Sequence, residues 1–167
     1  LIDGVLSLAE SGQRPEEAVV VDVSRVVAMV LEERSDEIRA RGVEVRCDGD
    51  LGRVVASETH VYQLFSNLLG NGFRHNDSTS PVLTLTHSSP CEGRHRYLMR
   101  DNGSGISRED MEAAFGPLRP GPPGSCKGLG LSIVKRIVEV YGGTFRIYNE
   151  GGACFEFELR DRARPIG

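Results

Sequence analysis

The chain has 167 residues, of which 39% are hydrophobic and 26% charged, as expected of one soluble globular domain with its own core. Its net charge is −4 and it contains no basic run, which argues against nucleic acid as the main partner. No apolar stretch approaches the roughly 20 residues needed to cross a bilayer. An initiator Met and a signal peptide are both missing, so we expect a piece of a longer protein.

The N-terminal part of the sequence predicts helices and short strands. Apolar residues recur at helical spacing over Leu1–Gly12, a segment too short to be a stable helix alone. Asp22 or Ser24 is expected to cap a helix over Arg25–Arg41, which Gly42 ends in the left-handed conformation. Strands rich in β-branched residues are predicted over Ala18–Val21, Val43–Cys47 and Arg53–Ala56.

A strongly amphipathic helix is predicted next, over Glu58–His75, with Ser57 as its N-cap. Its apolar residues form one stripe directed at a core: Val61, Leu64, Phe65, Leu68 and Leu69. A short helix over Arg108–Ala114 and a second strong helix over Gly130–Tyr141 follow. The remaining strands are predicted over Val82–Thr86, Arg96–Asp101, Thr144–Tyr148 and Cys154–Leu159, the last two as a hairpin around Gly151 and Gly152.

These elements place the chain in the α+β class. Strands grouped with three helices predict a two-layer α/β sandwich, in which a mixed, mostly antiparallel sheet packs against three helices. The cysteines and histidines add no metal or disulfide pattern, because they are scattered without ligand spacing. A reducing compartment is therefore expected for the cysteines, Cys47, Cys91, Cys126 and Cys154.

The helix over Glu58–His75 also carries a polar stripe beside its apolar one. Asn67, Asn71, Arg74 and His75 stand at i, i+4, i+7 and i+8, so they share one face. A neutral amide oxygen suits Mg²⁺, which takes one or two protein oxygens together with nucleotide phosphates. Any one of these residues alone is better explained as part of a solvated helix face, and the combination in this context favours the site.

Two glycine boxes follow this helix. Asp101-Asn102-Gly103-Ser104-Gly105 comes at the end of a strand, where a ligand can reach the carboxylate, although the pentapeptide alone is also typical of a turn. Gly128-Leu129-Gly130-Leu131 opens a helix. The free amides and the dipole of a helix start favour anions, so this box predicts a phosphate site to which Lys127 can add charge.

In this order the three motifs resemble the ATP-binding domain of sensor histidine kinases, in the Bergerat or GHKL superfamily, over about residues 1–159. The resemblance implies the Bergerat fold, with ATP and Mg²⁺ as cofactors. Asn71 matches the magnesium ligand, and Asp101 the residue that accepts a hydrogen bond from the adenine amine. The implied nucleotide contacts are Asn67, Asn71, Arg74, His75, Asp101, Gly103, Gly105, Ile106, Phe115, Lys127, Gly128, Leu129, Gly130 and Leu131.

Asn67 and Asn71 are the expected catalytic residues, and Asn67 separates two branches of the superfamily. The gyrase and MutL branch has a glutamate there that acts as general base on water, whereas an amide cannot accept that proton. The site therefore resembles the kinase branch, which holds ATP and leaves the nucleophile to another domain. Phe115 matches the aromatic anchor at the base of the ATP lid.

Three features depart from the family pattern. The segment between Phe115 and Gly128 is short and contains four prolines, which restrict its conformation and remove amide donors. Cys126 stands where the second glycine box commonly has its first glycine. Cys154 occupies a place often held by threonine close to the adenine pocket. These departures make nucleotide binding a safer expectation than turnover.

The resemblance also implies a domain organisation. Residues 1–14 are expected to be the tail of a dimerisation and phosphotransfer hairpin with its linker, residues 15–160 the ATP-binding domain, and residues 161–167 a tail. The segment with the phosphoacceptor histidine is missing, so the chain is the donor half of a kinase. Implied partners are the upstream histidine domain of the same protein and, indirectly, a response regulator. The chain is expected to be cytoplasmic, as the cytoplasmic portion of a sensor that can be membrane-anchored. The full-length protein is expected to be a homodimer, and the fragment by itself can be monomeric.

Two alternatives remain open at this point. One is a serine kinase related to anti-sigma factors, which shares the fold, although the helix over Leu1–Gly12 argues against it. The other is a degenerate kinase that binds nucleotide, or only partners, as a switch. The short proline-rich lid supports the second alternative.

Overall fold

The computed structural model describes residues 18–115 and 127–162. Their helices are α2 (Val23–Glu33), α3 (Ser35–Arg41), α4 (Glu58–His75), α5 (Arg108–Phe115) and α6 (Lys127–Val140). Their strands are β1 (Val19–Asp22), β2 (Glu44–Asp48), β3 (Arg53–Ala56), β4 (Val82–Ser88), β5 (Arg94–Asp101), β6 (Phe145–Asn149) and β7 (Ala153–Arg160). The helix predicted over Leu1–Gly12 and the proline-rich segment with Cys126 lie outside the described residues.

The strands form two sheets. β1 pairs with β3 in a small antiparallel sheet, and the other strands form a five-stranded sheet in the order β2-β4-β5-β7-β6. Only the pairing of β2 with β4 is parallel within this sheet. β6 and β7 form the predicted hairpin, in which Asn149 pairs with Ala153 beside the turn. The predicted mixed, mostly antiparallel sheet is confirmed.

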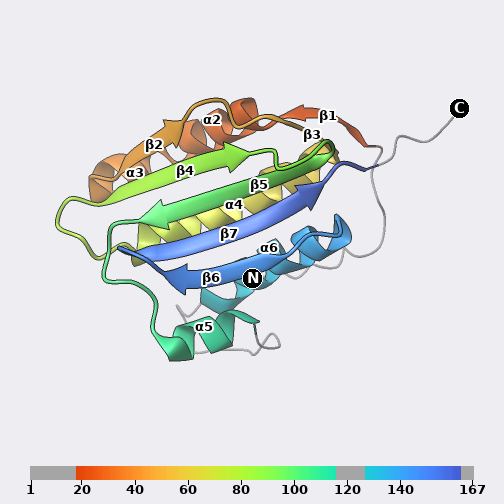
Figure 1. Cartoon of the computed structure of the whole chain (residues 1–167). Coiled ribbons are helices and arrows are strands. Elements are labelled where there is room, and N and C mark those ends of the chain that lie inside the picture. The colour runs from red at the N-terminus through yellow and green to blue at the C-terminus, as the bar shows by residue number, and fades with distance from the viewer. Residues whose placement is uncertain (1–17, 116–126, 163–167) are drawn as a thin grey trace, which may run out of the picture.

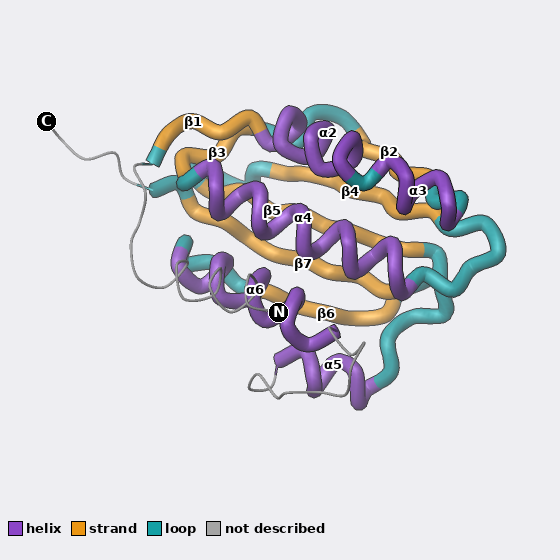
Figure 2. Tube along the Cα trace, turned by 180° about the vertical axis from the view of Figure 1, so that it is seen from behind, coloured by secondary structure: helices purple, strands orange, loops and turns teal. Residues whose placement is uncertain are grey.

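The helices lie on one face of the five-stranded sheet and leave the other face open (Figures 1 and 2). α2, α4 and α6 form this layer, with α4 in the middle and α6 beside it. Tyr141 just beyond α6 accepts a hydrogen bond of 2.9 Å from the backbone N–H of Ser57, the N-cap of α4. Because the end of α6 thus meets the start of α4, the two helices run antiparallel, and the first turn of α6 lies towards the C-terminal end of α4.

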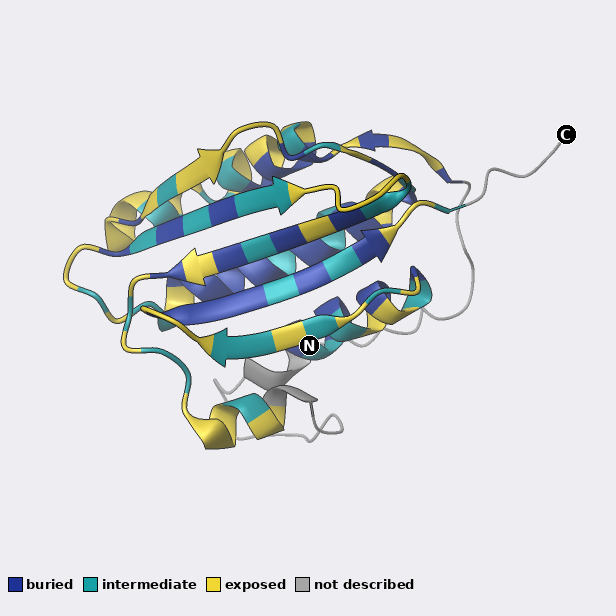
Figure 3. Cartoon of the chain, in the orientation of Figure 1, coloured by how far each residue is buried: buried dark blue, intermediate teal, exposed yellow. Residues whose placement is uncertain are grey.

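The core fills the space between the two layers. The predicted stripe of α4 is fully buried, and so are alternate residues of the sheet, such as Tyr97 and Met99 on β5 and Phe155 and Phe157 on β7. Figure 3 shows this alternation of buried and exposed positions along the strands. One face of each strand is therefore committed to the core, and the other carries polar side chains.

The helix predicted over Arg25–Arg41 is wrong as a single element. It is interrupted at Arg34, which ends α2 and begins α3 with φ −101° and ψ 15°. The Arg34 guanidinium donates hydrogen bonds of 3.2 Å to the carbonyl and hydroxyl oxygens of Ser66 on α4. A Cβ at Gly70 would lie 2.9 Å from this guanidinium. The break thus coincides with a residue anchored to α4, a contact that the local pattern does not contain.

Candidate functional site

The end of β5 and the end of α4 meet at one end of the domain. Asn76, the C-cap of α4, donates a hydrogen bond of 3.0 Å from Nδ2 to Oδ1 of Asn102. The same oxygen accepts the N–H of Val82 at 2.8 Å, and Nδ2 of Asn102 donates to the carbonyl of Ser80 at 2.9 Å. The first glycine box is thereby fastened beside the last turn of α4, which carries the other half of the predicted site.

Asp101 lies in the layer between the sheet and the helices. Strand alternation places it on the same face as Tyr97 and Met99, and it is only 5% exposed. Its Oδ1 accepts two backbone N–H groups, from Gly103 at 3.0 Å and from Ala153 at 2.9 Å. Its Oδ2 has no hydrogen-bond partner among residues 18–115 and 127–162. A buried carboxylate is thus fixed by one oxygen and presents the other as an acceptor.

Both glycines of this loop pack against side chains from other parts of the chain. A Cβ at Gly103 would lie 2.7 Å from Oδ1 of Asp77, and one at Gly105, where φ is +95°, would lie 2.6 Å from Oδ1 of Asn149. Asp77 also accepts hydrogen bonds from the N–H and hydroxyl of Ser104, and these bonds lower the pKa of its carboxyl. The left-handed backbone and the close contact at Gly105 therefore favour glycine there, whereas a side chain at Gly103 would have to displace the Asp77 carboxylate. The predicted place of both glycines under a base remains a prediction.

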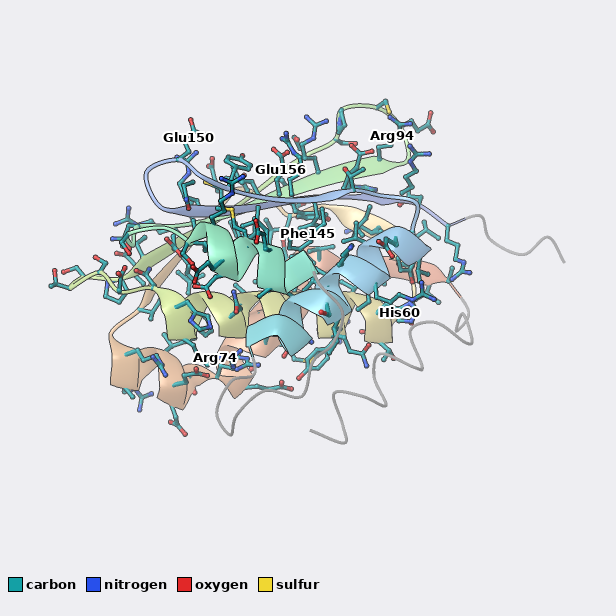
Figure 4. The ribbon with its side chains drawn as sticks, turned by 90° about the horizontal axis from the view of Figure 1, so that it is seen from below. His60, Arg74, Arg94, Phe145, Glu150 and Glu156 are labelled. Atoms are coloured by element: carbon teal, nitrogen blue, oxygen red, sulfur yellow. The ribbon has the colours of Figure 1, made fainter. Side chains whose placement is uncertain are left out.

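The residues of the polar stripe on α4 differ in how far they are buried. Asn67 is half-buried, and its Nδ2 donates to the carbonyl of Gln63 one turn earlier, at 2.7 Å. Asn71 is only 3% exposed, yet its amide forms no hydrogen bond in the described part of the chain. His75 is half-buried and Arg74 is exposed on the helix side of the molecule (Figure 4). An amide in a buried residue that forms no hydrogen bond to the described residues is available to a ligand.

The second glycine box lies inside a helix, because α6 begins at Lys127, three residues before the predicted start. Gly128, Leu129 and Gly130 therefore belong to its first turn, where backbone amides lack partners within the helix. Leu131 is buried in the core, and Ile106, in the loop after β5, packs against the same core. Phe115 is the last residue of α5. The side chains of Phe115 and of residues 127–130 are not among the described ones.

Asn149, the last residue of β6, was not among the residues predicted from the sequence. Its Oδ1 accepts the N–H of Ile106 and its Nδ2 donates to the carbonyl of the same residue, both at 2.9 Å. Asp77 and its bonds to Ser104 were missed as well. No local pattern marks either residue, since each meets the loop from a segment far away in sequence.

Cys154, expected close to the adenine pocket, faces away from Asp101. Strand alternation puts Cys154 on the face of β7 opposite to Ala153, whose N–H bonds to Asp101. Its thiol is buried and lies 3.7 Å from the carbonyl of Glu150, at the turn of the hairpin. The residue beside Asp101 is therefore Ala153.

A separate hollow of about 270 Å³ lies on the open face of the sheet. Glu156 and Glu158 form ion pairs there with Arg146 and Arg96. Figure 4 shows Glu156, with Arg94 and Glu150, on the side of the sheet away from the helices, and Phe145 on the helix side. The hollow is lined by Arg96, Thr144, Arg146, Glu156, Phe157 and Glu158. The charges in the hollow are paired with one another, whereas Asp101 has an oxygen without a hydrogen bond among the described residues.

The chain resembles known proteins over most of its length. Residues 56–163 match the family model of histidine kinase-, DNA gyrase B- and HSP90-like ATPases. It is 30% identical over 96% of its length to cyanobacterial phytochrome B of Nostoc, and 32% identical over 95% to the methanogenesis regulatory histidine kinase FilI of Methanothrix harundinacea. It spans 22% and 18% of the length of these two relatives.

The fold agrees with a solved catalytic domain. The structure of the catalytic domain of the histidine kinase ThkA superposes with a TM-score of 0.73 at 25% sequence identity. The match covers 87% of this chain and 97% of the ThkA domain.

No helix in the described ranges is long and apolar enough to cross a membrane.

Proposed function

Since the chain belongs to the family of histidine kinase-, DNA gyrase B- and HSP90-like ATPases and is a catalytic ATP-binding domain of the sensor histidine kinase type, we propose that it binds ATP with Mg²⁺. We propose further that it donates the γ-phosphoryl group to a histidine on a dimerisation domain of the same protein. Residues 15–160 make up the donor half in this proposal.

The observation that carries the proposal is Oδ2 of Asp101, which has no hydrogen-bond partner among the described residues. Gly103 and Ala153 hold Oδ1 with two backbone N–H groups, which fixes the carboxylate in a buried position. Oδ2 then accepts a hydrogen bond from the exocyclic amine of adenine. Guanine presents a carbonyl at the corresponding position, which an acceptor oxygen repels, so the site selects adenine.

The polar groups of α4 and α6 suit the phosphates. The buried amide of Asn71 supplies one neutral oxygen to Mg²⁺, in keeping with a cation that takes few protein ligands. The described residues hold no cluster of three acidic, histidine or cysteine side chains for a metal. In this proposal the nucleotide phosphates and water would supply further ligands. Arg74, His75, Lys127 and the amides of Gly128–Gly130 supply positive potential.

Asn67 supports transfer to a protein nucleophile rather than to water. Its amide is bonded to Gln63 and has no basic group with which to activate a water molecule. Phosphoryl transfer depends mainly on alignment and on neutralising charge, so a donor site without a base suffices when the acceptor is a histidine. When bound, Mg²⁺ would neutralise part of the charge on the phosphates. In this proposal the response regulator is an indirect partner.

We also propose that the domain lies in the cytoplasm, because its substrate ATP is found there.

The proposal is tested by incubating the chain with ATP labelled at the γ-phosphate and Mg²⁺, alone and with the separately expressed upstream segment of its own gene. Alone, the chain is expected to remain unlabelled, because the acceptor is absent. With the upstream segment, label should appear there as an acid-labile, base-stable phosphoramidate. Acid-stable label on Ser or Thr of the chain itself would contradict the proposal and favour a serine kinase.

A further inference from the structure

The loop from Asn102 to Ser107 connects Asp101 to α5 and is held by side chains from outside it. On one side Asp77 bonds to Ser104. On the other side the turn of the β6–β7 hairpin approaches it, where a Cβ at Gly152 would lie 1.9 Å from the carbonyl oxygen of Asp101. The backbone N–H of Ala153 in the same hairpin fixes the Asp101 carboxylate. The hairpin turn thus supports the start of the loop.

Asn149 extends this support to the end of the loop. It stands opposite Ala153 in the hairpin register, so one rigid pair reaches both Asp101 and Ile106. Both edges of its amide are used on a single residue, since Oδ1 accepts from the N–H of Ile106 and Nδ2 donates to its carbonyl. Only a side chain with a donor and an acceptor side by side can do this.

The residue that Asn149 holds also begins the next element. Ser107 follows Ile106 and caps α5, with its hydroxyl accepting the N–H of Asp110 at 3.1 Å and its carbonyl accepting that of Met111 at 3.0 Å. Gly105 precedes Ile106 with a left-handed backbone and no room for a Cβ against Asn149. The position of this peptide therefore depends on the Asn149 amide.

We propose that Asn149 is a positioning residue for the nucleotide: its amide fixes the Gly105–Ile106 peptide relative to Asp101, so that the loop is in its binding conformation before ATP arrives. The inference rests on the proposed ATP site. A preformed loop saves the ordering cost of binding, and releasing it should weaken affinity without removing any direct contact to the ligand.

The test uses Asn149→Asp, because a carboxyl group mimics the amide only when it is protonated. Ionised, it keeps the acceptor for the Ile106 N–H but sets a negative oxygen against the Ile106 carbonyl. Protonated, it again offers a donor and an acceptor, and the repulsion raises the pKa of the introduced carboxyl towards the accessible range. The affinity ratio of variant to wild type for Mg-ATP is measured by calorimetry between pH 8 and pH 5. Every other ionisable group is common to the two proteins, so the ratio isolates the introduced group.

We expect Asn149→Asp to bind Mg-ATP about tenfold more weakly than wild type at pH 8, and the deficit to shrink to about threefold at pH 5. Equal affinities at every pH, or a loss that does not change with pH, would overturn the inference. Tyr97→Phe is the control, because it removes the hydrogen bond of 2.8 Å to the Leu51 carbonyl at the far end of β5. It should lower the melting temperature and leave Mg-ATP affinity unchanged.

Asn149→Ala keeps the inference testable if the charged variant is too unstable at pH 8. It adds no charge, so a loss of about fivefold that is independent of pH is expected. Wild-type affinity in this variant would also overturn the inference. Failure of the wild-type chain to bind Mg-ATP would instead contradict the proposed function itself, and so the two failures can be told apart.

Discussion

Buried polar groups differ in their hydrogen bonding between the two ends of the five-stranded sheet. At the start of β5, His95 bonds to Asp161 at 3.0 Å and to His87 at 3.2 Å, and the Tyr97 hydroxyl donates to Leu51. At the end of β5, Asp101 uses one oxygen of two, and Asn71 nearby has no hydrogen bond in the described part of the chain. Polar groups that satisfy one another indicate a structural role, whereas an uncommitted buried group indicates a ligand.

One residue departs from this pattern at the structural end, by which we mean the end of the sheet with His95, Tyr97 and Asp161. Nη1 of Arg162 is buried and has no hydrogen-bond partner among the described residues, while the guanidinium lies over the Tyr141 ring at 5.8 Å from its centre. A cation over an aromatic face recovers part of the lost hydration. The difference between the two ends can be tested by making matched changes at both.

The largest effect is expected where a glycine touches backbone. Gly152→Ala would place its Cβ 1.9 Å from the Asp101 carbonyl oxygen, and Gly143→Ala would place its Cβ 1.6 Å from that of Glu158. Each should lower the free energy of unfolding by roughly 3 kcal/mol, because neither backbone can move away freely. Melting curves measure this loss. At a temperature where both variants are folded, only Gly152→Ala should also weaken Mg-ATP binding. Equal weakening by both variants would erase the distinction between the two ends.

A smaller and more specific effect is expected for Asn71→Ala. Because the amide has no hydrogen bond in the described chain to lose, the melting temperature of the free protein should hardly change. Mg-ATP affinity should fall about tenfold, while affinity for ATP in the presence of a chelator stays constant. Calorimetry with and without Mg²⁺ measures both values. A magnesium dependence equal to that of wild type would remove Asn71 from the metal site.

The smallest effect concerns pH at the structural end. Burial, and then the neighbouring His95, lower the pKa of His87, which also faces Asp50 and Tyr97. A histidine whose pKa is lower in the folded than in the unfolded state contributes stability above its unfolded pKa of about 6.5, and this contribution is lost as the pH falls. In His87→Gln the fall in melting temperature between pH 7.5 and pH 5.5 should be smaller by roughly 1–2 °C. An identical fall in both proteins would show that His87 does not contribute. Mg-ATP affinity relative to wild type should not change over this range.

Much of the fold could be predicted because its helices and strands follow from local sequence patterns. The apolar stripe and the Ser57 cap predict α4 with its observed ends, and Gly42 ends α3 with φ 65° as expected. The strands lie within two residues of their predicted bounds. Asp22 is the cap that the sequence left open between two candidates. Each of these features depends on residues within one or two turns of the chain.

The remaining features depend on contacts that no local pattern contains. Arg34, at the break between α2 and α3, bonds to Ser66, 32 residues away, and Ile106 is held by Asn149, 43 residues away. The facing of Cys154 follows from the register of β7, which one residue of shift would reverse. Of the candidate site, the motif residues could be named from the sequence. The way Asp101 is fixed by Ala153 could not, because a backbone N–H carries no sequence signal.

The central claim is that the free oxygen of Asp101 binds adenine, and one pair of substitutions tests it most directly. Asp101→Asn and Asp161→Asn make the same change at the two ends of the sheet, since Asp161 also accepts a backbone N–H, that of Val55 at 2.9 Å. By calorimetry, Asp101→Asn should lose at least about 1.5 kcal/mol of Mg-ATP binding free energy, because an NH₂ group then faces the adenine amine. Asp161→Asn should bind as wild type does, with a lower melting temperature. Equal Mg-ATP affinity in Asp101→Asn and wild type would contradict the account.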